Sequence, residues 1–259
     1  MKRICNCYIC FYVIILVSVI LFNTYAAHAQ EVMANKLSKK ILVVLHPLKS
    51  ATLSAEVPSV VKKIHHEMGE KFREKEVLID FDSKFYLADK KKANALLTYA
   101  NTVYKTNQKL YNQKSVSDVE FAKARADLDV AKADLSIASK KLSACSIRAP
   151  YHGRVVRLLV KENEIVQQGQ PLIEIVDDQI MRAKFHVPLG FNGHLDIGQT
   201  LNVKVRGINK NFECKITHIS PQMESNTFTF QMFAEIDNAG NILQGGMTGE
   251  ILLTHSKGN

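Results

Sequence analysis

The sequence lacks the short motifs that mark common catalytic centres. It contains no G-x-S-x-G nucleophile elbow, no Walker phosphate-binding loop and no H-E-x-x-H zinc pair. Two adjacent histidines, His65 and His66, lie in a predicted strand, so their rings would point to opposite faces and cannot chelate one ion together. We therefore expect no enzymatic activity, no cofactor and no bound metal ion.

Cysteine is scarce outside the N-terminal region. Three of the five cysteines lie within the first ten residues, and only Cys145 and Cys214 follow. These two could form one disulfide or remain as two buried thiols. We favour thiols, because each cysteine lies inside an apolar run and nothing else indicates a fold stabilised by disulfides.

A long membrane-spanning run is also missing. Residues 1–29 have the order of an export signal, with Lys2-Arg3, a mostly apolar run over 11–22, and small residues at 27–29. The apolar run is shorter than the roughly 20 residues that span a bilayer, so cleavage before Gln30 is favoured over a retained anchor. No cysteine lies between this run and the cleavage site, so N-terminal acylation is not indicated.

Positive charge exceeds negative charge, but it is dispersed. The chain has 34 basic and 25 acidic residues, and loss of Lys2 and Arg3 with the signal lowers the formal net charge from +9 to +7. The basic residues are not interleaved with aromatic residues, which argues against a nucleic-acid partner. A weak attraction to anionic lipid headgroups is compatible with this charge.

Residues 85–142 have the periodicity of two helices. Small or apolar residues recur at alternating steps of three and four, which is the pattern of a coiled-coil seam. The predicted seam residues are Ala93, Leu96, Ala100, Val103, Asn107 and Leu110, followed by Phe121, Ala124, Leu128, Ala131, Leu135, Ala138 and Leu142. Between the two runs lie polar residues 111–115 and a capping box, Ser117-Asp-Val-Glu120. We expect an antiparallel hairpin with arms of roughly 40 Å rather than part of a bundle, because no further amphipathic helix is predicted.

The segments that flank the hairpin resemble each other. Residues 59–80 align without a gap on residues 153–174, and each half is predicted to form a strand, a turn and a second strand. The predicted turn positions are Gly69, Gly153, Asn163 and Gly169. Asn163 can replace glycine at positive φ, whereas Lys75, which aligns with Gly169, puts the second turn of the first half in doubt.

Further strands are predicted on both sides of this repeat. Residues 41–45 form a short apolar run, and residues 51–57 form a second extended stretch after Pro47. Beyond the repeat, alternating or apolar runs are separated by Gly, Pro and Asn turns, which is typical of a β-barrel. These runs are 184–187, 200–205, 212–219, 227–236 and 250–254.

Two sets of motifs resemble those of a known family. Residues 57–82 and 149–177 look like the two halves of a lipoyl-type domain. The later motifs resemble, in order, those of a β-barrel domain, at 182–188, 197–199, 219–221, 227–230 and 243–247. A lipoyl-type domain interrupted by a helical hairpin is characteristic of the periplasmic adaptor, or membrane fusion protein, family (HlyD-like) of tripartite efflux pumps. Residues 48–253 resemble this family.

This resemblance implies a mainly β fold with an inserted α-helical coiled-coil hairpin, comprising a lipoyl-like barrel-sandwich hybrid and a β-barrel domain. The expected division is a cleaved signal peptide (1–29), a lead with the first barrel strand (30–47), two lipoyl-like halves (48–84 and 146–178), the hairpin (85–145), the β-barrel domain (179–255) and a tail (256–259).

The resemblance also implies a function. An adaptor of this kind would link an inner-membrane transporter, RND rather than ABC, to an outer-membrane efflux duct for export of drugs or other small molecules. It would form a homo-oligomer, hexameric or a trimer of dimers. Its location would be the periplasm of a Gram-negative bacterium, associated with the inner membrane through its partners.

In this family the hairpin tip meets the duct through an Arg, a Leu and a Ser at fixed spacing. Leu110 and Ser117 match the Leu and the Ser. Thr106 stands at the arginine position, with Lys105 and Lys109 as nearby substitutes that lack its planar fork. The alternative interpretation is that Leu110 closes the seam and Ser117 only caps the second helix.

Larger adaptors contact the pump through a membrane-proximal domain built from both chain ends, and we expect that domain to be missing or vestigial here. Pump contact is then expected to pass to two loops of the barrel. The residues are Gly190, Phe191, Gly198, Gly246 and Met247. Phe228 stands where the family usually has an arginine, at an interior or interface contact.

Two other classes of function remain open. A stand-alone periplasmic module could bind a small molecule or a metal, although methionines more often fill gaps in cores. The candidate ligands are Met68, Met181, Met223, Met232 and Met247. A lipoyl or biotin carrier would present its acceptor lysine, here Lys84, in a tight exposed hairpin. Lys84 instead lies at the start of the first predicted helix, so we expect it to be an ordinary solvated residue.

Overall fold

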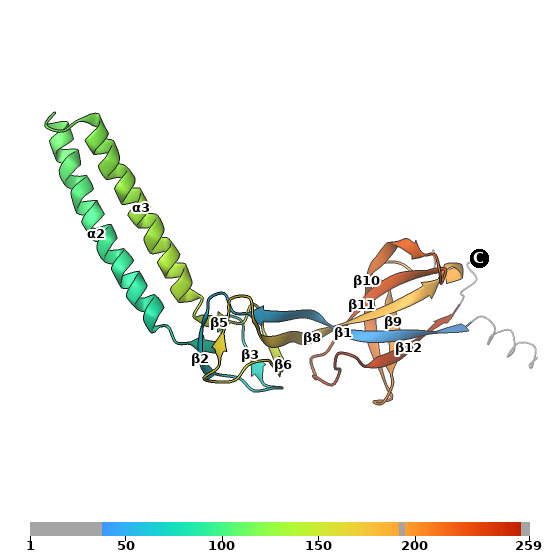
Figure 1. Ribbon diagram of the computed structural model, residues 1–259. Helices are drawn as coiled ribbons and strands as arrows, with labels where there is room; N and C mark the ends of the chain where they lie inside the picture. The colour runs from blue at the N-terminus through green and yellow to red at the C-terminus, as the bar shows by residue number, and fades with distance from the viewer. Residues whose placement is uncertain (1–37, 192–194, 255–259) are drawn as a thin grey trace, which may run out of the picture. The chain divides into compact units, whose positions relative to one another are not determined.

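The computed structural model describes residues 38–191 and 195–254, which belong to two units (Figure 1). One unit is Pro47–Gln179, and the other comprises the residues up to His46 and those from Ile180 onward. The predicted export signal lies outside the described residues. Within them, no helix combines the length and the apolar character that a membrane span requires.

Two long strands contribute residues to both units. They are β1 (Ser38–Ser54) and β8 (Pro171–Pro188). β1 joins the two stretches that the sequence predicts separately, and it continues through Pro47 without a break. The ladder with β12 uses Ser38–Val44, so the missing N–H of Pro47 removes no bond from that ladder.

The remaining strands of unit Pro47–Gln179 are short. They are β2 (Ser59–Ile64), β3 (Lys71–Phe72), β4 (Val77–Phe81), β5 (Ser146–Arg148), β6 (Gly153–Leu158) and β7 (Ile165–Val166). Four of them form a sheet in the order β5-β4-β2-β7, while β6 pairs with β3 and with β8. Their buried side chains form one core, which includes Val61, Phe72, Leu78, Ile79, Val155, Leu172 and Ile173.

The structure contains the repeat that the sequence predicts. The same shift of ninety-four positions relates β2 to β6, β3 to β7, and the first residue of β4 to that of β8. Gly69 and Asn163 have φ of 87° and 66°, and Lys75 and Gly169 have φ of 65° and 84°. The second turn of the first half, which Lys75 put in doubt, is therefore present.

A side-chain hydrogen bond helps to explain why this turn forms without glycine. The Glu76 carboxylate accepts from the Arg73 N–H at 2.7 Å, and the Gln170 side-chain oxygen accepts from the Gln167 N–H at 3.0 Å in the equivalent turn. The Lys75 N–H donates to the Ala149 carbonyl at 2.8 Å. These bonds hold Lys75 in a conformation that a residue with a Cβ adopts only at a cost.

We expect Lys75→Gly to raise the free energy of unfolding by about 0.5–1 kcal/mol. Glycine removes a left-handed penalty of about 1–2 kcal/mol, which its greater freedom in the unfolded chain partly offsets. Urea denaturation measures the change. Glu74→Gly is the matched control, because Glu74 is not among the residues with positive φ and should lose stability. A loss in both variants would show that Lys75 is not strained.

Gly153 lies at a different place from the one predicted. It is the first residue of β6, is buried, and pairs with Phe72 of β3, so it is not in a turn. A Cβ at this position would lie 2.0 Å from the Val176 carbonyl oxygen and 3.3 Å from Cζ of Phe72. Close approach of two backbones, rather than a positive φ, therefore requires glycine here.

The other unit is built from antiparallel strands. The further strands are β9 (Thr200–Val205), β10 (Lys210–Glu224), β11 (Thr229–Asp237) and β12 (Thr248–Thr254), with a short 3-10 helix η1 (Leu189–Phe191) after β8. Neighbours follow the order β1-β12-β9-β10-β11-β8, and β1 also pairs with β8. Alternate side chains point into one apolar core, which includes Val43, Leu45, Phe185, Val203, Ile216, Met232 and Ile251.

The predicted strands of this unit are present, but their extents differ: β8 reaches back to Pro171, and β12 begins at Thr248. β10 continues through Pro221 to Glu224, with a shift in its pairing to β11 between Ile219 and Met223. β11 begins only at Thr229, because the preceding Phe228 has φ of 52° and lies in a turn.

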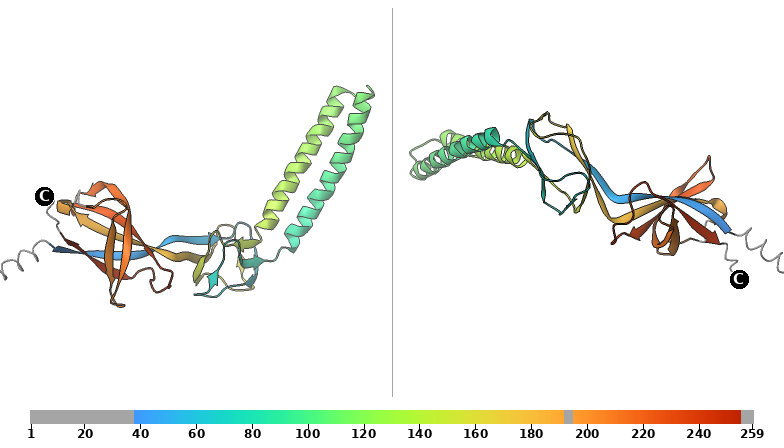
Figure 2. Two further views of the ribbon diagram at one scale, coloured as in Figure 1. Left: turned by 180° about the vertical axis from the view of Figure 1, so that it is seen from behind. Right: turned by 90° about the horizontal axis from the view of Figure 1, so that it is seen from below.

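The helices α2 (Lys84–Asn112) and α3 (Asp118–Ser143) lie side by side, as both views in Figure 2 show. The short turn between them makes them antiparallel. Six small or apolar residues are buried between them, namely Ala93, Ala100, Ala124, Leu128, Ala131 and Ala138. Alanine lets the two helices approach closely.

The predicted seam of α2 is wrong by one residue along part of the helix. Leu96 is 49% exposed, whereas Leu97 and Tyr104 pack against the buried cluster of Ala100, Leu128 and Ala131. The aromatic body of Tyr104 replaces Val103 in this contact. The apolar ring of a tyrosine can pack in the contact between two helices while its hydroxyl remains in contact with water.

Candidate functional site

The hairpin tip is the first candidate site, and backbone hydrogen bonds hold its turn. The Leu110 carbonyl accepts from the N–H groups of Gln113 and Ser115 at 3.1 and 2.8 Å. Lys114 follows with φ of 57° and closes the reversal. The Leu110 side chain is 36% exposed in the last turn of α2, so part of an apolar surface faces solvent here.

The predicted capping box at the start of α3 is confirmed. The Ser117 hydroxyl accepts from the Glu120 N–H at 3.2 Å, and the Glu120 carboxylate accepts from the Ser117 N–H at 3.2 Å. Asp118 and Glu120 place negative charge in the first turn, where the helix dipole favours it.

We expect Ser117→Ala to lower the free energy of unfolding by about 1 kcal/mol, because the Glu120 N–H in the first turn of α3 loses the hydroxyl that accepts its hydrogen bond. Thermal denaturation of the isolated protein measures the loss. Ser115→Ala is the matched control, since the Ser115 hydroxyl only donates to the Gln113 carbonyl at 3.4 Å. Equal melting temperatures for the two variants would contradict a capping role.

An aromatic stack lies below the tip, and sequence reasoning missed it. The Phe121 ring stacks on Tyr111 and on Tyr104, with centroids 4.7 and 5.7 Å apart. The hydrogen bond from the Tyr111 hydroxyl to Asp118, and the charge of that carboxylate, raise the pKa of Tyr111. The spacing of Tyr104 and Tyr111, seven residues apart on α2, is the signal that could have revealed it.

The other predicted tip residues are on the surface. Lys105 and Lys109 are exposed on α2. The Thr106 hydroxyl donates to the Thr102 carbonyl at 3.0 Å, within its own helix. Thr106 therefore does not replace the bidentate guanidinium of an arginine. Lys84 is the exposed first residue of α2, as expected.

The barrel loops are the second candidate site. Gly190 and Phe191 lie in η1, and residues 192–194 lie outside the described residues. Gly198 and Gly246 have φ of 92° and 88°, so each turn needs a residue that tolerates the left-handed region. Met247 is half-buried beside the barrel core.

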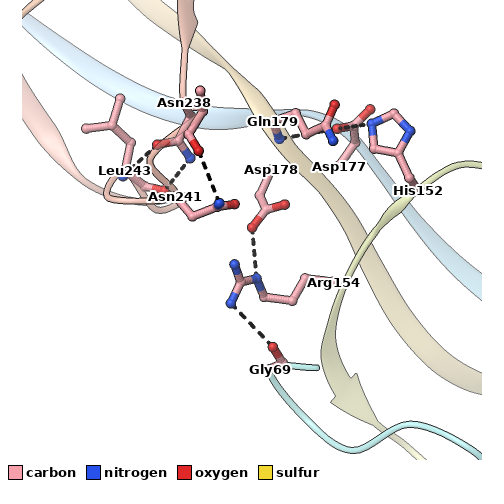
Figure 3. Close-up of polar contacts among 10 residues, drawn as sticks. Gly69, His152, Arg154, Asp177, Asp178, Gln179, Asn238, Asn241 and Leu243 are labelled. Atoms are coloured by element: carbon pink, nitrogen blue, oxygen red, sulfur yellow. Dashed lines mark hydrogen bonds and ion pairs between the residues drawn. The ribbon is translucent and has the colours of Figure 1, made fainter. Parts of the chain in front are cut away.

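Two sets of hydrogen bonds hold the loop before Met247. The Asn238 amide donates to the Leu243 carbonyl and accepts from the Leu243 N–H, both at 2.9 Å (Figure 3). The Gly246 N–H donates to the Leu45 carbonyl, and the Leu45 N–H donates to the Met247 carbonyl, both at 2.8 Å. The turn is therefore a rigid part of the barrel unit.

Phe228 is not an interior residue. Its ring is 63% exposed, and its carbonyl accepts from the Leu189 N–H at 3.1 Å. The residue that replaces the family's arginine therefore lies on the surface beside η1.

The end of unit Pro47–Gln179 carries a cluster of charges, shown in part in Figure 3. The Asp177 side chain is 5% exposed and lies 3.4 Å from His152 and 3.8 Å from Lys49. Arg154 donates to Asp178 at 2.8 Å and to the Gly69 carbonyl at 3.4 Å. The Lys49 ammonium offsets part of the cost of burying the Asp177 carboxylate, and the bond between Arg154 and Asp178 joins β6 to β8 within this unit.

The residue types that could bind metal are dispersed. His65 and His66 follow the end of β2 rather than lying within it, and they have separate partners: Asp80 at 2.9 Å for His65, and Glu76 at 3.5 Å for His66. Among the described residues, no three His, Cys, Asp or Glu side chains are grouped so as to hold an ion.

The candidate methionines are divided between the two units. Met181 and Met232 are buried in the barrel core, while Met68 is 73% exposed in the other unit. Cys145 and Cys214 are free and buried, and burial raises the pKa of the Cys214 thiol to about 11. Burial raises the pKa of the Cys145 thiol as well, which disfavours the reactive thiolate of both residues near neutral pH.

Comparisons with known proteins agree with this architecture. Residues 183–257 match the family model of the CusB-like β-barrel domain. A crystal structure of a MacA-MexA chimera, with the α-hairpin domain of Pseudomonas aeruginosa MexA, has a TM-score of 0.74 and 22% identity over 85% of this chain and 81% of that one. The membrane fusion protein Spr0693 of Streptococcus pneumoniae has a TM-score of 0.65 and 18% identity over 84% of this chain and all of that one.

The predicted resemblance to the periplasmic adaptor, or membrane fusion, proteins is thus confirmed, and the fold is mainly β with two helices and a β-barrel-like domain. A curated relative, an uncharacterised protein of Haemophilus influenzae, is 25% identical over 205 residues. The alignment covers 78% of this chain, which spans only 54% of that relative's length.

Proposed function

We propose that this chain is a periplasmic adaptor subunit that links an inner-membrane transporter to an outer-membrane duct of an efflux pump. The helix pair carries this proposal. Within its unit it extends away from the strands (Figure 1), and its inner contacts are made by α2 and α3 alone. It ends in a rigid turn with an exposed leucine, which suits contact with a partner. The match of the barrel to the CusB-like domain supports the same function.

The tip is proposed as the duct contact. Leu110 would enter an apolar groove between helices of the duct, and Ser117 would be presented beside it by the capping box. Lys105 and Lys109 would supply charge on the flank. The aromatic stack of Tyr104, Phe121 and Tyr111 would hold the tip in one conformation.

The barrel loops are proposed as the pump contact. Gly190 and Phe191 lie in η1 and Gly198 in a turn before β9, while Gly246 and Met247 end the loop that the bonds of Asn238 and Leu45 stiffen. The family model that matches the barrel is labelled RND, which favours an RND transporter over an ABC transporter. The adaptor would act in the periplasm, beside the inner membrane.

Exposed apolar residues along the helices support a homo-oligomer. Six such residues, 49–77% exposed, lie on the two helices, namely Phe85, Leu96, Tyr99, Val119, Val130 and Ile137. Contiguous apolar surface on a protein usually marks a contact. Copies packed side by side would bury it, and a hexamer or a trimer of dimers would close a ring.

Sedimentation of the mature protein with and without its pump components tests this function. We expect oligomers of the chain, and a larger complex once transporter and duct are added. A chain that remains monomeric in both cases, and carries a tightly bound small ligand instead, would favour a stand-alone binding module.

A further inference from the structure

A groove on the barrel unit has no role in the proposed function. Its volume is about 530 Å³, which lies within the range of roughly 300–1,000 Å³ for small-molecule pockets. It is lined by β1 and β8, with Thr229 from the start of β11. The lining comes entirely from this one unit.

The apolar part of the lining is exposed for a structural reason. Val43 and Leu45 of β1 point into the barrel core, so the alternating side chains Leu42 and Val44 point outward, and the buried Ile41 also borders the groove. Leu42 is 54% exposed. Pro188, at the end of β8, adds a further apolar surface.

The polar part of the lining is basic. None of the ten lining residues is acidic, and five are Lys or His, namely Lys39, Lys40, His46, Lys184 and His186. Lys40 lies 3.7 Å from Glu250, and His186 lies 3.2 Å from Glu224. Over residues 38–191 and 195–254, Lys39 and Lys184 make no ion pair. The groove therefore has cationic groups that a ligand could neutralise.

We propose that this groove binds one anionic amphiphile, a molecule with a negatively charged head and a single alkyl chain. The head would lie against the ammonium groups of Lys39 and Lys184, and the chain would cover Leu42, Val44 and Pro188. Charge complementarity and an apolar floor in one small groove favour this occupant.

Two other occupants fit less well. An extended peptide would add to a free strand edge, but β1 pairs with β12 and β8, and β8 pairs with β11 and β1. A bilayer surface would meet basic residues spread over a convex face, whereas these line a groove of limited volume. The proposal concerns the isolated chain and does not depend on contact with a pump or a duct.

Three probes distinguish the contribution of the charged head to binding from that of the alkyl chain. Decanoate has both head and chain, acetate has the head alone, and 1-decanol has the chain alone. We expect decanoate below its micellar concentration to saturate one site on the chain as it accumulates in cells, measured by calorimetry. Acetate and 1-decanol should each bind at least about tenfold more weakly, because each loses one set of contacts.

Matched variants locate the site. Lys39→Gln with Lys184→Gln should weaken decanoate binding by about tenfold or more, and Leu42→Asp should do the same. The control pair Lys204→Gln with Lys210→Gln removes the same charge from exposed positions of β9 and β10, and should change binding by less than about twofold.

Several results would overturn the proposal. Equal weakening by both lysine pairs would indicate non-specific attraction, and decanoate binding that never saturates would indicate the same. Vesicles of phosphatidylcholine with and without phosphatidylglycerol complete the test. Retention by the anionic vesicles that depends on Lys39 and Lys184, without saturable binding of decanoate, would replace the amphiphile site with a membrane surface.

Discussion

Replacing Gly153 with alanine is expected to lower the free energy of unfolding by about 3–5 kcal/mol, a large part of the 5–15 kcal/mol that typically holds a domain. The added Cβ would lie 2.0 Å from the Val176 carbonyl oxygen and 2.9 Å from its carbon. Both are backbone atoms of β8, held by the pairing of β6 with β8. Relief therefore requires the strands to separate, which also disturbs the core around Phe72.

Denaturation in urea, followed by circular dichroism, measures this loss. Gly190→Ala is the control, because a Cβ at Gly190 meets no atom within 4 Å and the residue does not have a positive φ. It should change the free energy of unfolding by less than about 0.5 kcal/mol. A Gly153→Ala protein as stable as the control would show that β6 and β8 can move apart cheaply.

Replacing Leu110 with aspartate is expected to abolish most export while leaving the fold intact. The side chain is 36% exposed at the end of α2, so its loss should cost less than about 1 kcal/mol of stability. In the proposed complex, the same change would force a charge into an apolar groove of the duct, which is strongly unfavourable. Drug susceptibility and the melting temperature of the purified variant together separate the two effects.

Leu87→Asp is the matched control for this prediction. Leu87 is 44% exposed at the opposite end of α2, so the variant places the same charge on the same helix away from the tip. It should retain export. If Leu110→Asp instead melts like a substitution of the buried Leu128 and leaves export unchanged, Leu110 belongs to the helix contact and is not a docking residue.

Local patterns predicted most of this fold, because they depend on neighbours in the sequence. The three-and-four spacing located both helices, and the serine and glutamate at 117 and 120 identified the start of α3. The repeat placed the turns at Gly69, Asn163 and Gly169. Alternation located the barrel strands, since inward and outward side chains must differ in polarity.

The incorrect predictions concern positions whose structure depends on contacts that the order of apolar and polar residues does not reveal. Leu96 and Leu97 are equally apolar, and positions 93, 97, 100 and 104 have the same alternating spacing of three and four as 93, 96, 100 and 103, so the pattern does not decide which leucine packs against α3. Gly153 is required by a carbonyl on another strand, and Lys75 adopts a left-handed conformation because hydrogen bonds hold its turn.

The hairpin tip and the basic groove differ in how far the sequence alone could locate them. The tip could be located from sequence because its residues lie within one short segment. The basic groove could not, because its lining comes from residues around 40, 186 and 229 that only the strand order brings together.

The central claim is that one chain contacts a transporter through its barrel and a duct through its hairpin. Site-specific photocrosslinking in cells, with the reactive residue placed at Leu110 in one strain and at Met247 in another, tests it most directly. We expect the adduct from position 110 to contain an outer-membrane protein and the adduct from position 247 to contain an inner-membrane transporter. Adducts at both positions that contain the same partner, or only further copies of this chain, would contradict the bridging function.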